Sequence, residues 1–332
     1  MRLSIAMCTY NGGSSLREQL TSVLTQGRLP DELVICDDGS TDCTVEIVRE
    51  FQAAAPFEVQ LIVNDKKLGS TKNFEKCIQL CKGDIIVLSD QDDSWQPDRL
   101  RLSEEVFLAR PDAGAVFSDA LIVDDNLEPM GYNLCETAHF GNRLKQKVAA
   151  GKSFEALLAH NVVTGATMAF RAEFRPLVIP IPAIWVHDGW IAILISAVAN
   201  VIYIDKPLVK YRQHSTQQLG ARKRSIATHM ASAWANDNRE AYKTFPQQYR
   251  FVRDRLEQVV KTGLPAWEMT LLEEKIRHLN LRAELKRSHI ARVPAILKEF
   301  AFGRYGRFGY GWRGAVRDLV VNLAAKPEGL QE

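Results

Sequence analysis

The sequence predicts an α/β protein with a doubly wound sheet, followed by a helical extension. Over the first 110 residues, short apolar runs typical of buried strands alternate with segments of helical periodicity, the order that produces a parallel sheet covered on both faces. After His214 the apolar runs give way to basic segments with helical periodicity. At 332 residues the chain exceeds one ordinary domain, so we expect a first domain over 1–220 and an extension over 221–332.

Each of the first four expected strands is followed by an expected helix. The strands are 3–7, 32–36, 59–63 and 84–89, and the helices are 14–26, one beginning after Asp42, 70–81 and 97–110. No G-x-G-x-x-G follows the first strand, and no G-x-x-x-x-G-K-[ST] occurs anywhere. The missing motifs therefore argue against a dinucleotide-binding dehydrogenase and against a P-loop enzyme.

Beyond Ala113 the expected elements are less regular. The polar stretch 126–152 has no clear period, and we expect a mobile loop there. The apolar run 190–204 spans about 15 residues, too short for a membrane span, and predicts a buried helix followed by a strand. The remaining expectations are strands over 115–123, 162–170 and 201–204 and helices over 247–260, 265–287 and 316–325.

Charge is distributed unevenly along the chain, although the formal net charge is only +2. Residues 222–332 hold 21 Lys and Arg against 12 Asp and Glu, whereas residues 1–221 hold 21 against 28. The acidic part suits a metal site and the basic part suits an anionic surface. The six cysteines show neither metal-ligand spacing nor a disulfide framework, and the chain enters a strand almost at once. These features favour a cytoplasmic protein.

The segment Ser89-Asp90-Gln91-Asp92-Asp93 directly follows a predicted buried strand. Three carboxylates this close repel one another unless a cation neutralises them. The carboxyl end of a strand is also where ligands bind in open α/β sheets. A divalent metal carrying a phosphorylated substrate would explain the cluster. The alternative is that Asp92 and Asp93 open a turn and cap the helix beginning near Pro97.

Six short motifs, in their order along residues 1–220, resemble glycosyltransferase family 2, whose fold is called GT-A. The motifs are Thr9-Tyr10-Asn11, Asp37-Asp38-Gly39-Ser40, Lys72-Asn73, Ser89-Asp90-Gln91-Asp92-Asp93, His187-Asp188 and Tyr211-Arg212-Gln213-His214. The chain looks most like the bacterial branch that builds surface polysaccharides and often carries S-D-Q-D-D-x-W. One departure is that relatives often show H-x-x-N where this chain has His214-Ser-Thr-Gln217.

The resemblance implies a set of donor-binding residues. The carboxylate of Asp38 would accept a hydrogen bond from the nucleotide base, and Tyr10 and its neighbours would wall the nucleoside. The full set is Thr9, Tyr10, Asn11, Asp38, Lys72, Asn73 and Asp90. Plainer readings stay open: Asp38 as a cap of the next helix, Tyr10 as a core aromatic and Lys72 as a helix-surface residue.

The resemblance also implies a metal site and a catalytic base. Asp92 and His214 would bind Mn²⁺ or Mg²⁺, with Asp90 reaching the ribose or a metal-bound water. Asp188 would be the base, with His187 as a competitor and the N-cap of its helix as the plainer role. Three tryptophans could stack on sugars or belong to the core: Trp95, Trp185 and Trp190.

The implied activity is inverting transfer of a sugar from a nucleotide-diphospho-sugar donor to a glycan or lipid-linked acceptor, with no nucleic acid partner. One alternative is a nucleotidyltransferase of similar fold, which would normally carry a basic loop where Cys8–Gly13 has neither Arg nor Lys. Another is a nucleotide-sugar-binding module without catalysis.

The basic segment 302–325 predicts contact with an anionic membrane, on the cytoplasmic face of the inner membrane, whereas 265–287 could equally be a helical cap or a dimer contact.

Overall fold

The computed structural model describes residues 1–213, 239–260, 265–286 and 288–321. The predicted metal ligand His214 and the divergent Gln217 lie outside these residues. The chain forms two compact units, Met1–Ser153 with Val162–Arg222 and Phe154–Asn161 with Lys223–Glu332. A short segment from the first half of the sequence therefore belongs to the second unit.

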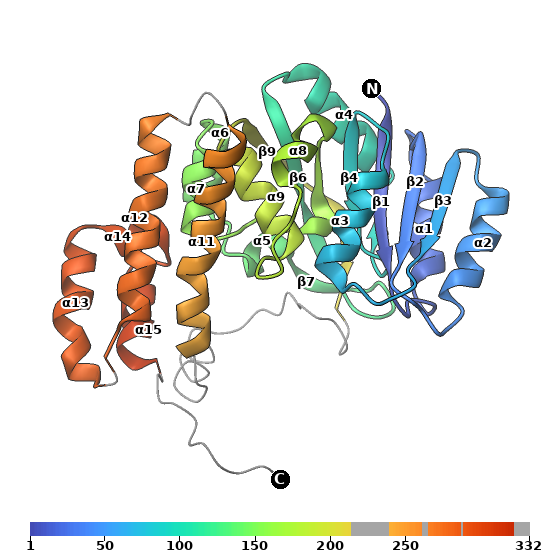
Figure 1. Ribbon diagram of the computed structural model, residues 1–332. Coiled ribbons are helices and arrows are strands. Elements are labelled where there is room, and N and C mark those ends of the chain that lie inside the picture. Colours follow the sequence, from blue (N-terminus) through green and yellow to red (C-terminus); the bar gives the residue numbers. More distant parts are fainter. Residues whose placement is uncertain (214–238, 261–264, 287, 322–332) are drawn as a thin grey trace, which may run out of the picture. The chain divides into compact units, whose positions relative to one another are not determined.

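The first unit is built on one mixed sheet, which has nine strands within the described part of the chain (Figure 1). The order across the sheet is β3-β2-β1-β4-β8-β6-β9-β5, and β7 pairs with β6. The strands are β1 (Leu3–Thr9), β2 (Glu32–Asp37), β3 (Glu58–Val63), β4 (Ile85–Ser89), β5 (Ser94–Trp95), β6 (Ala113–Val123), β7 (Pro129–Asn133), β8 (Met168–Arg171) and β9 (Asn200–Arg212). The predicted doubly wound mixed sheet is confirmed.

Strands β3, β2, β1 and β4 are parallel, and each lies within two residues of its predicted bounds. The register places Thr9 beside Asp37 and Met7 beside Ser89. Because parallel strands end on the same side, the polar segments that follow β1, β2 and β4 leave the sheet along one edge.

Strand β9 is longer than predicted. The predicted strand ended at Ile204 because Asp205, Lys206 and Pro207 interrupt the apolar pattern. The strand continues through them with a register shift opposite Asp119, and Tyr211 then pairs with Ile122. The Tyr-Arg motif is therefore part of the sheet.

Two predictions about the middle of the chain were wrong. The stretch 126–152 is not a loop, because it contains β7 and the helices α5 (Leu134–Thr137) and α6 (Asn142–Ala149). Their anchors, Phe140 and Val148, are buried too far apart to show a period. The predicted strand 162–170 is confined to β8, and a 3₁₀ turn over Gly165–Thr167 precedes it. The N–H of Gly165 donates to the side chain of Asp188 instead of to a neighbouring strand.

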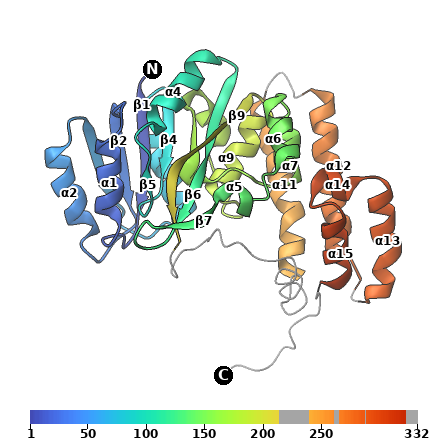
Figure 2. The same ribbon diagram turned by 180° about the vertical axis from the view of Figure 1, so that it is seen from behind.

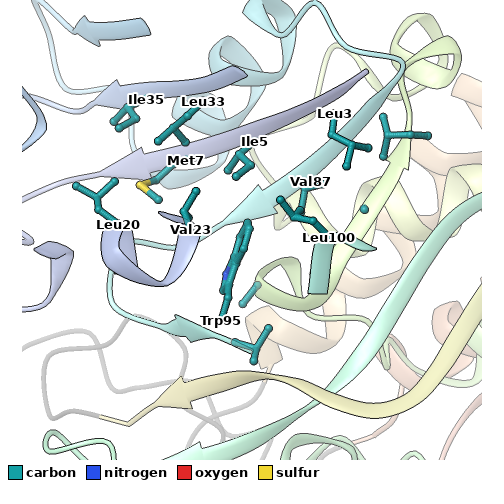
Figure 3. Packing of buried hydrophobic residues seen from close by; sticks show 14 of the residues in the cluster. Leu3, Ile5, Met7, Leu20, Val23, Leu33, Ile35, Val87, Trp95 and Leu100 are labelled. Atoms are coloured by element: carbon teal, nitrogen blue, oxygen red, sulfur yellow. The ribbon is translucent and has the colours of Figure 1, made fainter. Parts of the chain in front are cut away.

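Helices cover both faces of the sheet (Figures 1 and 2). One face packs against α1 (Leu16–Leu24), α2 (Thr44–Ala54) and α4 (Arg99–Ala109), and the other carries α3 (Ser70–Leu80) and α9 (His187–Ser196). Figure 3 shows the first of these interfaces, where Ile5 and Met7 of β1 meet Leu20 and Val23 of α1 and the ring of Trp95. Burying each such side chain stabilises the fold by about 1.5–3 kcal/mol.

The second unit is helical, as predicted. Its described helices are α7 (Ser153–Ala159, whose first residue belongs to the first unit), α11 (Arg239–Val259), α12 (Ala266–Ala283), α13 (His289–Ala301), α14 (Arg304–Phe308) and α15 (Trp312–Val320). In α12, Leu272, Ile276 and Leu279 are buried whereas Trp267 is 50% exposed. Residues 322–325, the end of the last predicted helix, lie outside the described residues. Within the described residues, none of the helices combines the length and apolar character that a bilayer span requires.

Candidate active site

The segments that follow β1 and β2 are tied together by hydrogen bonds. The hydroxyl of Thr9 donates to Asp37 Oδ2 (2.8 Å), and the N–H of Asn11 donates to the hydroxyl of Ser40 (2.9 Å). Asn11 has a φ of 46°, and its Oδ1 accepts the N–H of Thr41 (2.9 Å). The first two predicted motifs therefore form one structure.

Asp38 is buried and holds the loop that leads into α3. Its Oδ1 accepts the N–H of Leu68 (2.7 Å) and the side-chain amide of Asn64 (3.0 Å), and its Oδ2 accepts the N–H of Gly69 (2.8 Å). The N-cap of the following helix α2 is Cys43, and the carboxylate next to it that accepts a backbone N–H of the first turn, that of Thr44, is Asp42. The capping role considered for Asp38 is therefore wrong. A carboxylate offers about four acceptor positions, so one remains for a ligand donor.

Gln91 connects the β4 segment to the β1 segment. Its Oε1 accepts the N–H of Tyr10 (2.8 Å), and its Nε2 donates to the Tyr10 carbonyl (3.1 Å). Tyr10 is 41% exposed, and the ammonium of Lys67 lies 3.6 Å from its ring centroid. Tyr10 is therefore a surface aromatic and not a core residue.

The two residues predicted at the start of α3 have different surroundings. Asn73 is buried, and its amide donates to the Cys36 carbonyl (2.7 Å) and accepts from Asn64 (2.8 Å). Its side chain thus braces β2 against α3. The ammonium of Lys72 forms an ion pair with Glu75 (2.7 Å) on the same helix.

The acidic segment after β4 is an electrostatically coupled cluster. Burial raises the pKa of Asp90, and the negative charges of Asp92 and Asp188 add to this effect. Together they bring the pKa to about 7. Burial and the charges of Asp92 and Asp90 also raise the pKa of Asp93 well above its usual range. Asp93 Oδ1 accepts the N–H of Arg212 (3.2 Å), whereas its Oδ2 has no hydrogen-bond partner among the described residues.

Two buried arginines to which the sequence assigned no role, Arg99 and Arg212, adjoin this cluster. Arg99 stands over the ring of Trp95 at 3.8 Å and donates to the Leu88 carbonyl (2.9 Å). Burial lowers its pKa to about 9, and Asp93 and Asp90 act to raise it. Arg212 Nε donates to the Asp92 carbonyl (2.8 Å), and its guanidinium also contacts Glu18. The available signal for Arg99 was an arginine four residues after a tryptophan at the start of an apolar helix.

Tyr211 connects the cluster to the His187-Asp188 motif. Burial raises its pKa, and the charges of Asp93, Asp90, Asp92 and Asp188 raise it further. The structure therefore brings Tyr211, from the sixth predicted motif, close to the fourth and fifth motifs, although Asp90 and Tyr211 are 121 residues apart in sequence.

Asp188 lies in the first turn of α9. It is the second residue of the helix, so it is not the N-cap. Its Oδ2 accepts the N–H of Gly165 (2.9 Å), and its Oδ1 accepts the N–H of Gly189 (2.5 Å). These bonds fix the carboxylate against the turn before β8.

His187 and two of the candidate tryptophans face the interior. The ring of His187 is buried and stacks on Phe74 with a centroid separation of 3.9 Å, and burial lowers its pKa. Trp190 is 1% exposed and donates to the Val178 carbonyl (2.7 Å), and Trp95 is 4% exposed beneath Arg99. Trp185 lies beside Trp190, with a centroid separation of 6.0 Å. Trp95 and Trp190 are therefore core residues.

No group of three or more His, Cys, Asp and Glu side chains in the described part of the chain is arranged to hold a metal ion. The donor chemistry of the cluster nevertheless fits a hard divalent cation. Asp90 and Asp92 supply carboxylate oxygens, and a cation would offset both the burial of Asp90 and the like charges of Asp92 and Asp188 that together raise its pKa.

The model of glycosyl transferase family 2 matches residues 4–157. The dTDP-rhamnosyl transferase RfbG of Shigella flexneri is 30% identical over 229 residues, which are 65% of this chain and 74% of that protein. The chain belongs to glycosyltransferase family 2. An uncharacterized glycosyltransferase of Nostoc is 26% identical over 73% of this chain and 70% of its own length.

Two solved structures share the fold of this chain at low sequence identity. The S. aureus protein TarS 1–349, crystallised with UDP-GlcNAc, has a TM-score of 0.52 and 14% identity, covering 96% of this chain and 90% of that one. The mannosyltransferase PcManGT of Pyrobaculum calidifontis, in complex with GDP-Man and Mn²⁺, has a TM-score of 0.56 and 19% identity, covering 95% and 78%. The first unit is accordingly a GT-A fold.

Proposed function

We propose that this glycosyltransferase transfers a sugar with inversion from a nucleotide-diphospho-sugar to a glycan or lipid-linked acceptor in polysaccharide biosynthesis. The observation that carries the proposal is the coupling of Asp90, Asp92 and Asp188 at one edge of the sheet. Transfer needs a site for the donor diphosphate beside a group that takes a proton from the acceptor, and this edge offers both.

The nucleoside is proposed to lie against the segments after β1 and β2. Asp38 has one acceptor position left for a base N–H, and the exposed ring of Tyr10 offers a wall. Thr9 and Asn11 support that wall through their bonds to the β2 segment. Asn73 would support this site indirectly, because its side chain accepts a hydrogen bond from Asn64 in the loop before α3. Lys72 remains a candidate donor contact because its side chain is 39% exposed.

The diphosphate is proposed to lie at the acidic segment with Mn²⁺ or Mg²⁺. Asp92 and His214 would hold the ion and Asp90 the ribose. A bound divalent cation would offset the charge of the leaving nucleoside diphosphate. The complexes of PcManGT with GDP-Man and Mn²⁺ and of TarS with UDP-GlcNAc support a donor of this class.

Asp188 is proposed as the base. The acceptor oxygen forms a bond to the anomeric carbon as the bond from that carbon to the diphosphate breaks, and the acceptor proton passes to the Asp188 carboxylate. The bonds from Gly165 and Gly189 hold that carboxylate in position, which preserves its orientation during the transfer. His187 is the weaker candidate, because its ring is buried against Phe74.

The test is a donor screen with the purified full chain. UDP-, dTDP- and GDP-sugars, dTDP-rhamnose among them because of RfbG, are incubated with Mn²⁺ and with acceptor extracts, and released nucleoside diphosphate is measured. We expect release with one donor class and its loss in Asp188→Asn. Release of pyrophosphate from a nucleoside triphosphate and a sugar phosphate would instead identify a nucleotidyltransferase. Donor binding without turnover in any acceptor would indicate a non-catalytic binding module.

The polysaccharide role also implies where the enzyme works. A lipid-linked acceptor is presented at a membrane, so we place the protein in the cytoplasm and peripherally on the cytoplasmic face of the inner membrane. The basic composition of residues 222–332 supports this placement.

A further inference from the structure

Helix α13 of the second unit exposes most of its apolar side chains and buries two of its charged ones. Its exposed residues are Ile290, Ala291, Val293, Pro294, Leu297, Lys298, Phe300 and Ala301, of which one is charged. The charged residues Arg292 and Glu299 are instead 1% exposed. A helix on the surface of a globular protein ordinarily turns its apolar stripe inward and its charges toward water.

The buried charges of α13 have partners, so the orientation of the helix is determined. The guanidinium of Arg292 donates to the carbonyls of Asp318 (3.1 Å) and Val321 (2.7 Å). Glu299 accepts from Arg304 (2.6 Å) and contacts the ring of His278 (2.6 Å). Rotating α13 to hide its apolar face would break these contacts and leave their buried partners, among them the His278 ring, without Arg292 and Glu299.

The apolar face is large and continuous along the helix. Ile290 is 85% exposed, Leu297 61% and Phe300 49%, and with Val293 they follow one another at spacings of three or four residues. Phe302, directly after the helix, is 59% exposed. Figures 1 and 2 show α13 at the outer edge of the helical unit, with α12, α14 and α15 between it and α11.

The chain segment that carries this face is predominantly basic, although Arg307 forms an ion pair with Glu274 (2.5 Å). Residues 285–321 contain Lys286, Arg287, Arg292, Lys298, Arg304, Arg307, Arg313 and Arg317, and their acidic residues are Glu299 and Asp318. Both acidic side chains are buried. The exposed charges of the described residues in this segment, Lys286, Lys298, Arg307 and Arg313, are therefore all positive.

We propose that the surface formed by Ile290, Val293, Leu297, Phe300 and Phe302 inserts into the interface of an anionic lipid bilayer. Apolar and aromatic side chains beside cations are the combination that binds such an interface, since the side chains enter the acyl boundary and the cations meet the headgroups. The proposal rests on the function proposed above, because the membrane contact would give access to a lipid-linked acceptor. It places the contact at residues 290–302, at and before the start of the segment 302–325 that the sequence predicts to contact the membrane.

The test is flotation of the full chain with vesicles of phosphatidylglycerol and phosphatidylcholine. Leu297→Glu should lower the fraction bound about tenfold or more, because it removes an inserting apolar side chain and adds a charge repelled by the lipid. Leu108→Glu is the matched control, since Leu108 is 63% exposed on α4 of the other unit. It should float like wild type, and all three proteins should melt at the same temperature. Raising the salt concentration or omitting phosphatidylglycerol should weaken binding.

Other outcomes would overturn the proposal. Equal flotation of Leu297→Glu and wild type would exclude this face as the lipid contact. Failure of wild type to float, with a dimer that Leu297→Glu converts to monomer, would assign the face to self-association. Donor turnover is measured separately on the same variants, so a wrong function would appear as absent turnover with flotation intact.

Discussion

The aspartates at the carboxyl edge of the sheet differ in what their oxygens contact. Asp38 accepts three N–H groups from the loop before α3, and Asp188 accepts two from glycines. Asp93 has one backbone N–H and one unpartnered oxygen among the described residues, whereas Asp90 is buried beside like charges. Asp38 therefore holds a loop, whereas proton acceptance by Asp188 and cation binding beside Asp90 are the roles proposed above.

Changing Asp188 to Asn should separate catalysis from binding. The amide keeps an oxygen that can accept the N–H of Gly165, so the fold and the donor affinity should be retained. Because an amide cannot take the acceptor proton, kcat should fall by roughly 10²–10⁴-fold. Steady-state kinetics, calorimetry with the donor diphosphate and melting curves measure the three quantities. Turnover within a few-fold of wild type would show that another group is the base.

Changing Asp92 to Ala should remove the metal-dependent part of donor binding. In Mn²⁺ the affinity for a nucleoside diphosphate should fall about 10- to 100-fold, since a charge-assisted ligand interaction contributes about 1.5–3 kcal/mol. Calorimetry in EDTA should give wild type and Asp92→Ala the same weak affinity. Asp98→Asn is a control, because the Asp98 side chain is 54% exposed. Wild-type binding that is equally strong in EDTA and in Mn²⁺ would exclude a metal from donor binding.

The raised pKa of Asp90 predicts how stability changes with pH. Its folded-state pKa of about 7 exceeds the model-peptide value of 3.8, so the folded protein binds this proton more tightly than the unfolded chain. Stability should therefore fall as pH rises from about 4 to about 7, by about 4 kcal/mol at most. In EDTA, Asp90→Asn should melt at a higher temperature than wild type at pH 8 and at nearly the same temperature at pH 4. Parallel curves for the two proteins would contradict the assigned pKa.

At the scale of elements, Gln91 connects the segment that follows β4 to the segment that follows β1, where the nucleotide-sugar donor is proposed to bind. Its amide makes two hydrogen bonds to the backbone of Tyr10, and Gly12 lies directly beneath it. A Cβ at residue 12 would come within 2.3 Å of Gln91 Oε1, so the amide would have to move. The absence of a side chain at Gly12 therefore leaves the space in which the Gln91 amide bonds to Tyr10.

Changing Gly12 to Ala should lower donor affinity about 5- to 150-fold, because it disrupts two hydrogen bonds of about 0.5–1.5 kcal/mol each. Gly141→Ala is the matched control, since a Cβ there has nothing within 4 Å and its φ is −80°. Gln91→Ala and the Gly12→Ala Gln91→Ala double variant should bind equally, since both act on the same bonds. Additive losses in the double variant would contradict this connection.

At the scale of the whole molecule, the parallel half of the sheet could be predicted because it depends on local pattern. Apolar runs and helical periodicity defined β1 to β4 within two residues, and the motifs at their ends are held together by the bonds among Thr9, Asp37, Asn11 and Ser40. The structure also places Tyr211 beside Asp90 and Asp188, and the roles that the resemblance implies for the two aspartates stay predictions.

The rest depends on long-range contacts that leave little local signal. The buried roles of Arg99 and Arg212 follow from packing across the sheet, where Arg212 reaches Glu18 from 194 residues away. The extension of β9 through Pro207 follows from pairing with β6. The exposed apolar face of α13 could be recognised only once Arg292 and Glu299 were seen to be buried. A sequence pattern shows that a helix has two faces but not which one the protein covers.

Segment Phe154–Asn161 has a practical consequence for anyone expressing part of this enzyme. The chain enters the second unit at Phe154, returns to the first at Val162 and leaves it again after Arg222. A genetic truncation after residue 222 would thus keep α7 but delete the other helices of its unit, and Phe154, Leu157 and Leu158, now 2%, 3% and 1% exposed, would lose that packing. Such a fragment is expected to aggregate on expression. To express the first unit alone, the chain has to be cut on both sides of α7 as well as after residue 222. A short designed turn then joins residue 153 to residue 162.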